Sequence, residues 1–153
     1  ALFGCPQVRA FEPVDQILEV LKCNIIHTFG SSFPHIQCYQ FAVGEVDGEG
    51  ELFVPDPSHG LIETSCSLNP EFKVNHARVL KTKIKTLDDH IREYPLSDSA
   101  SLILKIDVES LEPQVLKGSS VLISKYKPLI FLEILPTFVF GNSSLTIISL
   151  GHL

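Results

Sequence analysis

The feature that most constrains this chain is an apolar run at residues 102–106 that leads directly into an amphipathic helical segment. Asp107 and Glu109 follow the run, and apolar residues then recur at helical spacing from about residue 111 to residue 125. A buried strand followed at once by a helix is the repeating unit of α/β folds. Ligands bind just outside the carboxyl ends of the strands in open α/β sheets, so the two carboxylates are candidate site residues.

Other segments repeat this alternation of strand and helix. The pattern indicates a helix at residues 14–27 and further strands at residues 8–11, 36–43 and 129–134. Apolar strands that alternate with helices are typical of a parallel sheet that is covered on both faces. We therefore expect one α/β domain over residues 1–153, with the strands near residues 8, 36, 102 and 129 in a single, mostly parallel sheet.

The middle of the chain predicts an antiparallel excursion from that sheet. A Gly-rich turn at residues 47–50 indicates a hairpin, with residues 51–54 as the returning strand. Residues 79–86 alternate as a second strand, and the lysines on one of its faces either bind an anionic substrate or guard a solvated edge. We favour the second interpretation, because charged residues commonly protect exposed strand edges. A short helix is expected at residues 87–94.

Composition and charge limit the class of function. The chain of 153 residues is 44% hydrophobic and 20% charged, with a formal charge of −6, which fits a globular domain and disfavours nucleic-acid binding. No apolar run is long enough to span a membrane. The 4 scattered cysteines indicate reduced thiols and a cytoplasmic location. The 6 histidines lack the spacing of a metal site, so we expect no bound metal.

Glu12 is a candidate binding residue, because it stands at the end of the first predicted strand. A carboxylate in that position can accept hydrogen bonds from both hydroxyls of a nucleotide ribose. The alternative is an exposed acid that caps the next helix, and position alone does not separate the two. A GxGxxG loop, which would favour a dinucleotide, does not occur in the chain.

The side chains of Asp107 and Glu109 also allow two interpretations. If the strand continues through both residues, their side chains point the same way and face a common crevice. Alternatively, Asp107 caps the following helix and Glu109 lies in the field of its dipole. Glu133 ends the apolar strand at residues 129–134 and either faces the same crevice or pairs with a lysine.

Seven short motifs occur together in a fixed order. They are AFEP at residues 10–13, AVG at 42–44, DGEGELFVP at 47–55, TLDD at 86–89, LKIDVE at 104–109, EPQVLKG at 112–118 and KPLIFLEI at 127–134. In this order and spacing the chain resembles the FkbM family of S-adenosylmethionine-dependent methyltransferases over residues 8–135. The resemblance implies a Rossmann-like class I methyltransferase and O-methylation of a hydroxyl on a sugar or small natural product.

The resemblance also implies roles for particular residues. Glu12 matches the acid that binds the ribose, Ala42 and Val43 match the segment that lies against adenine, and Asp107 matches the acid beside the sulfonium and the acceptor. Asp107 is therefore a candidate for cofactor binding and for catalysis as a general base. Ser110 departs from the family pattern, which has a glycine at this position.

Two further interpretations follow from the ends of the chain and from the fold class. The chain starts without Met and reaches its first strand at once, so we expect a fragment without the family's first strand and Gly-rich cofactor loop. Such a fragment would be a non-catalytic Rossmann-like remnant or binding module. A nicotinamide-dependent oxidoreductase is a second alternative, because it also has a Rossmann-like fold.

Overall fold

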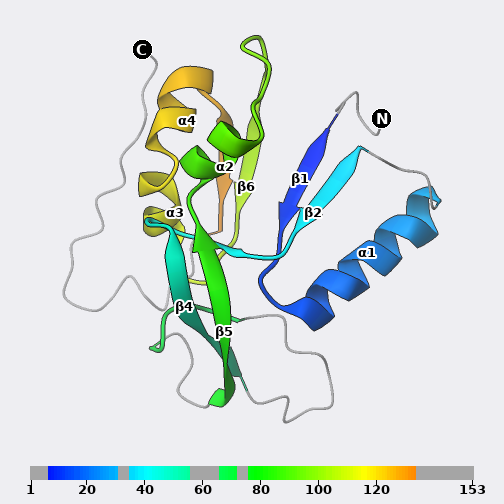
Figure 1. Ribbon diagram of the computed structural model, residues 1–153, viewed down its shortest axis with the longest axis vertical. Helices are drawn as coiled ribbons and strands as arrows, with labels where there is room; N and C mark the ends of the chain where they lie inside the picture. Colours follow the sequence, from blue (N-terminus) through cyan, green and yellow to red (C-terminus); the bar gives the residue numbers. More distant parts are fainter. Residues whose placement is uncertain (1–6, 31–34, 56–65, 72–75, 134–153) are drawn as a thin grey trace.

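The computed structural model describes residues 7–30, 35–55, 66–71 and 76–133 (Figure 1). The helices are α1 (Asp15–Phe29), α2 (Leu87–Glu93), α3 (Glu112–Lys117) and α4 (Ser120–Tyr126). The strands are β1 (Val8–Phe11), β2 (Ile36–Tyr39), β3 (Ala42–Val43), β4 (Gly48–Pro55), β5 (His76–Lys85), β6 (Ile103–Ile106) and β7 (Leu129–Leu132). Within the described ranges, no helix combines the length and the apolarity that crossing a membrane requires.

The strands form three small sheets instead of the single sheet predicted from the sequence. β1 pairs with β2 and β6 pairs with β7, both in parallel, while β3, β5 and β4 form a sheet in that order. The prediction of strands near residues 8, 36, 102 and 129 is therefore confirmed. The parallel orientation is also confirmed within the β1–β2 pair and within the β6–β7 pair. The single sheet is wrong for the described residues, because local apolar patterns identify strands but do not specify which strands are neighbours.

The antiparallel excursion is confirmed, but the strand after the turn at residues 47–50 pairs with β5 and not with the strand before that turn. β4 pairs with β5 along its whole length, and β3 adds to β5 in parallel (Figure 1). The predicted strand at residues 36–43 is divided between β2 and β3. Lys81 lies opposite Glu51, and Lys83 lies opposite Glu49, so these lysines face carboxylates across the ladder. That arrangement supports a solvated face over an anionic-substrate patch.

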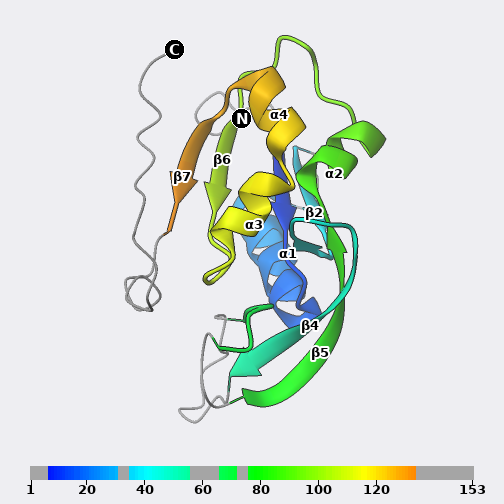
Figure 2. The same cartoon turned by 90° about the vertical axis from the view of Figure 1, so that its left-hand side faces the viewer.

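Helices lie on both sides of the β1–β2 pair, with α1 on one side and α2 on the other (Figures 1 and 2). In the second half, α3 and α4 cover one face of the β6–β7 pair. A buried cluster holds this half together, made of Leu87, Ile106, Val115 and Leu122. Apolar side chains on three helices and one strand thus fix the position at which β6 ends.

The helix predicted over residues 111–125 is two helices in the structure, because the helical backbone is interrupted at Gly118 and Ser119, between α3 and α4. Gly118 is the residue after α3, and a Cβ there would lie 2.1 Å from the carbonyl oxygen of Gly44. Ser119 follows, fully buried, and its hydroxyl donates to the carbonyl of Val115 at 2.5 Å. The close packing at Gly118 brings the end of α3 against the segment after β3.

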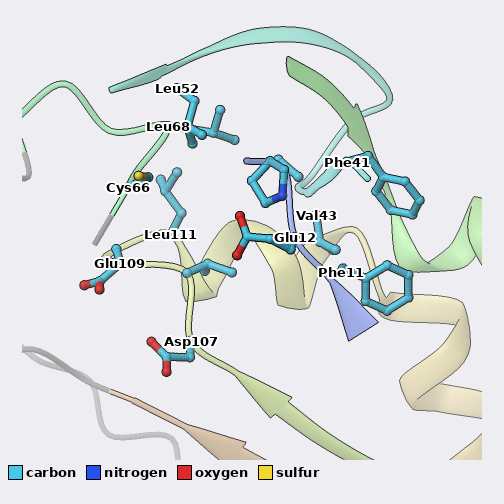
Figure 3. A pocket seen from close by; sticks show the side chains of 13 residues that line it. Phe11, Glu12, Phe41, Val43, Leu52, Cys66, Leu68, Asp107, Glu109 and Leu111 are labelled. Atoms are coloured by element: carbon cyan, nitrogen blue, oxygen red, sulfur yellow. The ribbon is translucent and has the colours of Figure 1, made fainter. Parts of the chain in front are cut away.

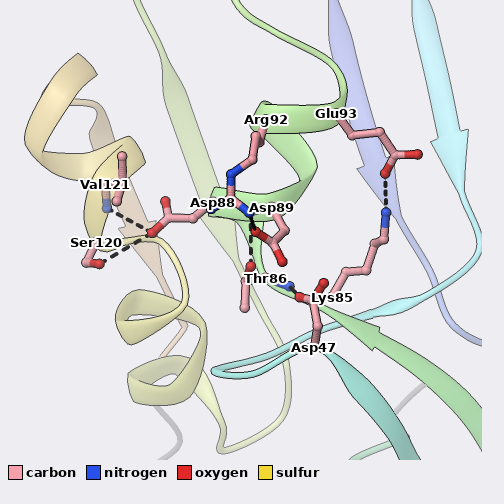
Figure 4. Close-up of polar contacts among 9 residues, drawn as sticks. All are labelled: Asp47, Lys85, Thr86, Asp88, Asp89, Arg92, Glu93, Ser120 and Val121. Atoms are coloured by element: carbon pink, nitrogen blue, oxygen red, sulfur yellow. Dashed lines mark hydrogen bonds and ion pairs between the residues drawn. The ribbon is translucent and has the colours of Figure 1, made fainter.

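The TLDD motif has a structural role at the start of two helices (Figure 4). The hydroxyl of Thr86 accepts a hydrogen bond from the backbone N–H of Asp89 at 3.0 Å and so caps α2. The carboxylate of Asp88 accepts from the backbone N–H groups of Val121 and Leu122, at 2.9 and 2.8 Å. Asp88 therefore satisfies the first turn of α4, and it joins the two helices.

The side chain of His90 on α2 is buried within a group of aromatic rings from β1, β2, the residue before β3 and the residue after α2. The rings of Phe11, Tyr39, Phe41 and Tyr94 lie 4.5–5.8 Å from the His90 ring. His90 is 1% exposed, and neither ring nitrogen has a hydrogen-bond partner among the described residues. Burial lowers the pKa of His90 to about 4, helped by the charges of Arg9 and Lys85 and opposed by that of Glu93.

We predict that Gly118→Ala destabilises the protein by about 1–3 kcal/mol, the usual cost of forcing an extra group into a packed interior. The backbone of Gly44 must move to admit the new methyl group, and urea unfolding measures the cost. Gly48→Ala is the matched control, since a Cβ at Gly48 meets nothing within 4 Å. Its effect should stay within about 0.5 kcal/mol. Equal stability of the two variants would contradict the close approach.

We also predict that protonation of His90 destabilises the fold in acid. The folded-state pKa of about 4 lies below the ordinary histidine pKa of 6.5, so this contribution to stability is present above pH 6.5 and is lost as the pH falls towards 4. The loss reaches about 3 kcal/mol at pH 4. Urea unfolding between pH 7 and pH 4 should show a shallower decline in His90→Phe than in the original protein. His27→Gln, at an exposed helical position, is the control; an unchanged decline in His90→Phe would contradict the prediction.

Candidate functional site

A cavity of about 280 Å³ lies between the ends of β1 and β6 and the β3–β5–β4 sheet (Figure 3). Its volume is near the lower end of the range of about 300–1,000 Å³ that is usual for small-molecule pockets. Both halves of the chain line it, with Phe11, Glu12, Pro13, Phe41, Ala42, Val43, Leu52, Cys66, Leu68, Asp107, Val108, Glu109 and Leu111. The wall is mostly apolar, and its acidic groups come from Glu12, Asp107 and Glu109.

Glu12 follows β1 directly, and its side chain projects into the cavity (Figure 3). One carboxyl oxygen accepts a hydrogen bond from the backbone N–H of Val14 at 2.8 Å, and the other has no partner among the described residues. Burial raises the pKa of Glu12, and the hydrogen bond from Val14 partly offsets the rise. Val14 is the N-cap residue of α1, so the carboxyl of Glu12 accepts from the N–H group at the start of that helix and also faces the cavity.

Ala42 and Val43 form β3, which lies against the same cavity. Ala42 is 6% exposed and Phe41 is 7% exposed, so this part of the wall is tightly packed and without charge. Gly44 follows, and its backbone N–H donates to the carbonyl of Lys85 at 3.0 Å. The AVG motif thus places apolar residues on the wall of the cavity that Glu12 also lines.

Asp107 follows β6 and also lines the cavity. Its carboxylate accepts a hydrogen bond from the ammonium group of Lys105 at 2.5 Å, and about a third of the side chain (36%) is exposed. This pairing raises the pKa of Lys105. Asp107 does not cap α3, because that helix begins five residues later at Glu112 and Leu111 is its N-cap.

The turn after Asp107 has an unusual backbone. Glu109 has φ of 53° and Ser110 has φ of 80°, both in the left-handed region that side chains disfavour. Each such residue costs about 1–2 kcal/mol. β6 ends at Ile106, so the strand does not continue through Glu109, and the condition for a common strand face of Asp107 and Glu109 is not met. The turn itself brings Glu109 to the cavity wall.

Glu133 lies outside this cavity. It follows β7, and its backbone N–H donates to the carbonyl of Ile106 at 3.1 Å, which extends the parallel ladder by one residue. Its charge contributes to the raised pKa of Lys105, after the larger effects of Asp107. Of the two expectations for Glu133, the structure supports proximity to a lysine.

Eight further lining residues are absent from the candidates of the sequence analysis: Phe11, Pro13, Phe41, Leu52, Cys66, Leu68, Val108 and Leu111. Leu52 is 3% exposed on β4, and Cys66 and Leu68 follow the Pro- and Ser-rich stretch after β4. Phe41, Cys66, Leu68 and Leu111 belong to none of the seven motifs, and the others are apolar members of motifs that indicated no role for them. The short apolar run at residues 52–54 of β4 was the one available signal, and it does not distinguish a cavity wall from an ordinary core.

A model of the methyltransferase FkbM domain matches residues 1–149, which is nearly the whole chain. The chain belongs to the FkbM methyltransferase family. Comparison with curated proteins and with solved structures finds no match to it. The predicted family is thereby confirmed, and Glu12, Ala42, Val43 and Asp107 of this FkbM-family chain all lie around one cavity.

Proposed function

We propose that this FkbM-family chain belongs to an enzyme that transfers a methyl group from S-adenosylmethionine to a hydroxyl oxygen of a sugar or small natural product. The observation that carries the proposal is the half-buried carboxyl of Glu12. It follows a parallel strand, faces a cavity and has one oxygen without a partner among the described residues. A carboxylate so placed is suited to accept hydrogen bonds from ribose hydroxyls.

The other lining residues fit the same cofactor. Ala42, Val43 and Phe41 offer an uncharged wall next to Glu12, as an adenine ring requires. The carboxylates of Asp107 and Glu109 supply negative charge on another part of the wall, which would favour a cationic group there. S-Adenosylmethionine combines these features, since its sulfonium centre is positively charged. Glu12, Ala42, Val43 and Asp107 would therefore hold the cofactor.

The arrangement of the strands is compatible with a Rossmann-like class I fold. β1 and β2 run in parallel, as do β6 and β7, and β1 and β6 both end at the cavity. Ligand sites outside the carboxyl ends of parallel strands are the rule in open α/β sheets. We infer that both pairs belong to one Rossmann-like architecture whose central crevice is this cavity.

When bound, the cofactor supplies an electrophilic methyl group, so the demands on the chain are modest. The protein must align an acceptor oxygen and exclude water, and such positioning supplies several kcal/mol. We assign to Asp107 the removal of the hydroxyl proton from the acceptor. Lys105, which donates to the carboxylate of Asp107 at 2.5 Å, orients that group.

Calorimetric titration tests the proposal with S-adenosylhomocysteine and with NAD, on the protein in the form in which cells produce it. We expect binding of S-adenosylhomocysteine and none of NAD. Glu12→Ala should weaken this binding by about 1–3 kcal/mol, as expected for a hydrogen bond to a charged group. Glu19→Ala, on the exposed side of α1, is the control. NAD binding would indicate an oxidoreductase, and binding of neither ligand would indicate a non-catalytic module.

Asp107→Asn separates catalysis from cofactor binding. The amide keeps the shape of the carboxylate but removes its basicity, so turnover should fall by about a hundredfold or more. Affinity for S-adenosylhomocysteine should remain within about threefold of the original value, because this neutral thioether lacks the positive sulfonium that the charge of Asp107 would favour. The measurements are methyl transfer to acceptors found by screening sugars and hydroxylated metabolites, and calorimetry. Loss of affinity without a separate loss of turnover would make Asp107 a cofactor ligand, and no change in either would remove it from the site.

A further inference from the structure

The left-handed turn after Asp107 is held by two polar side chains from a distant part of the chain. The hydroxyl of Ser67 donates to the carbonyl of Glu109 at 2.7 Å, across 42 residues of sequence. The side-chain amide of Asn69 donates to the hydroxyl of Ser110 at 3.0 Å, across 41 residues. These two contacts fall on Glu109 and Ser110, the two residues of the turn with positive φ.

Ser67 and Asn69 are themselves fixed. Ser67 is 1% exposed, and its backbone exchanges hydrogen bonds with Phe53 of β4 at 2.8 and 3.2 Å. Its hydroxyl also accepts from the backbone N–H of Asn69 at 3.0 Å, and the side-chain oxygen of Asn69 accepts from the backbone N–H of Glu71 at 3.0 Å. The pair is therefore anchored to the β4–β5 sheet before it reaches the turn.

We propose that Ser67 and Asn69 are positioning residues that hold the Glu109–Ser110 turn in its left-handed conformation and so set the places of Asp107 and Leu111 in the cavity. Glycine adopts positive φ without help, whereas serine and glutamate do not. With Ser110 at a position that carries a glycine in the family pattern, the turn depends on outside contacts for its shape. The functional part of this inference rests on the proposed methyltransferase activity.

A coupling between positions 69 and 110 distinguishes this role from a general contribution to stability. Asn69→Ala removes the contact to Ser110, and we expect about a three- to tenfold loss of affinity for S-adenosylhomocysteine, as for one hydrogen bond. Ser110→Gly also removes the hydroxyl that Asn69 contacts, but glycine adopts the turn without help, so Ser110→Gly alone should keep the affinity within about twofold of the original. Asn69→Ala should then change the affinity by less than about twofold in this background. Equal losses in both backgrounds would overturn the proposal.

Two further variants complete this test. Ser97→Ala removes a comparable hydroxyl contact, that with Ser99 at 3.1 Å on an exposed turn, and should leave the affinity unchanged. Ser67→Ala tests the second contact, and thermal unfolding reports whether this buried substitution still folds. If Ser67→Ala does not fold, the Asn69 and Ser110 variants decide the question.

Backbone chemical shifts of residues 108–111 give a readout that needs no ligand. In Asn69→Ala they should move away from left-handed values, and they should return towards them when Ser110→Gly is added. Absence of S-adenosylhomocysteine binding by the original protein would refute the proposed function, and the chemical shifts would then decide the positioning role alone. Left-handed shifts that persist in Asn69→Ala and in Ser67→Ala would overturn it.

Discussion

The shape of the cavity depends on one close approach between two backbone segments. Gly118 has no Cβ, and the carbonyl of Gly44 occupies the space that a Cβ would need. Because Gly44 follows β3 and Gly118 follows α3, this contact joins the sheet that carries Ala42 and Val43 to the helix that follows the turn after Asp107. The carboxylate of Asp88 then fixes α4 to α2 on the other side of the break. These contacts fix the position of the wall formed by β3 relative to the wall formed by the turn after Asp107.

The elements were largely predictable from the sequence, but their arrangement was not. Apolar runs identified β1, β6 and β7, and the helical spacing identified α1 and α2. The apolar periodicity over residues 111–125 predicts one continuous helix, because it runs through Gly118 and does not indicate the buried break at Ser119. The division into three sheets depends on contacts between strands far apart in sequence, and local patterns do not contain that information.

The candidate site was predictable where charge appears at the end of an apolar strand. Glu12 and Asp107 stand out for this reason, since a carboxylate there must face a polar space or find a partner. Ser67 and Asn69 were not identified, because a Ser- and Asn-containing loop has many possible roles. The left-handed turn was missed for a related reason, as neither Glu109 nor Ser110 is a residue that signals positive φ.

The half-buried carboxyl of Glu12 has a consequence for the lifetime of the protein in the cell. Its raised pKa means that burial opposes the charged form, so ionisation of Glu12 costs stability in the folded chain without a ligand. A ligand that satisfies the carboxyl would bind the folded state alone and shift the folding equilibrium by mass action. Proteases act on unfolded chains, so the abundance of the protein would follow the supply of its ligand.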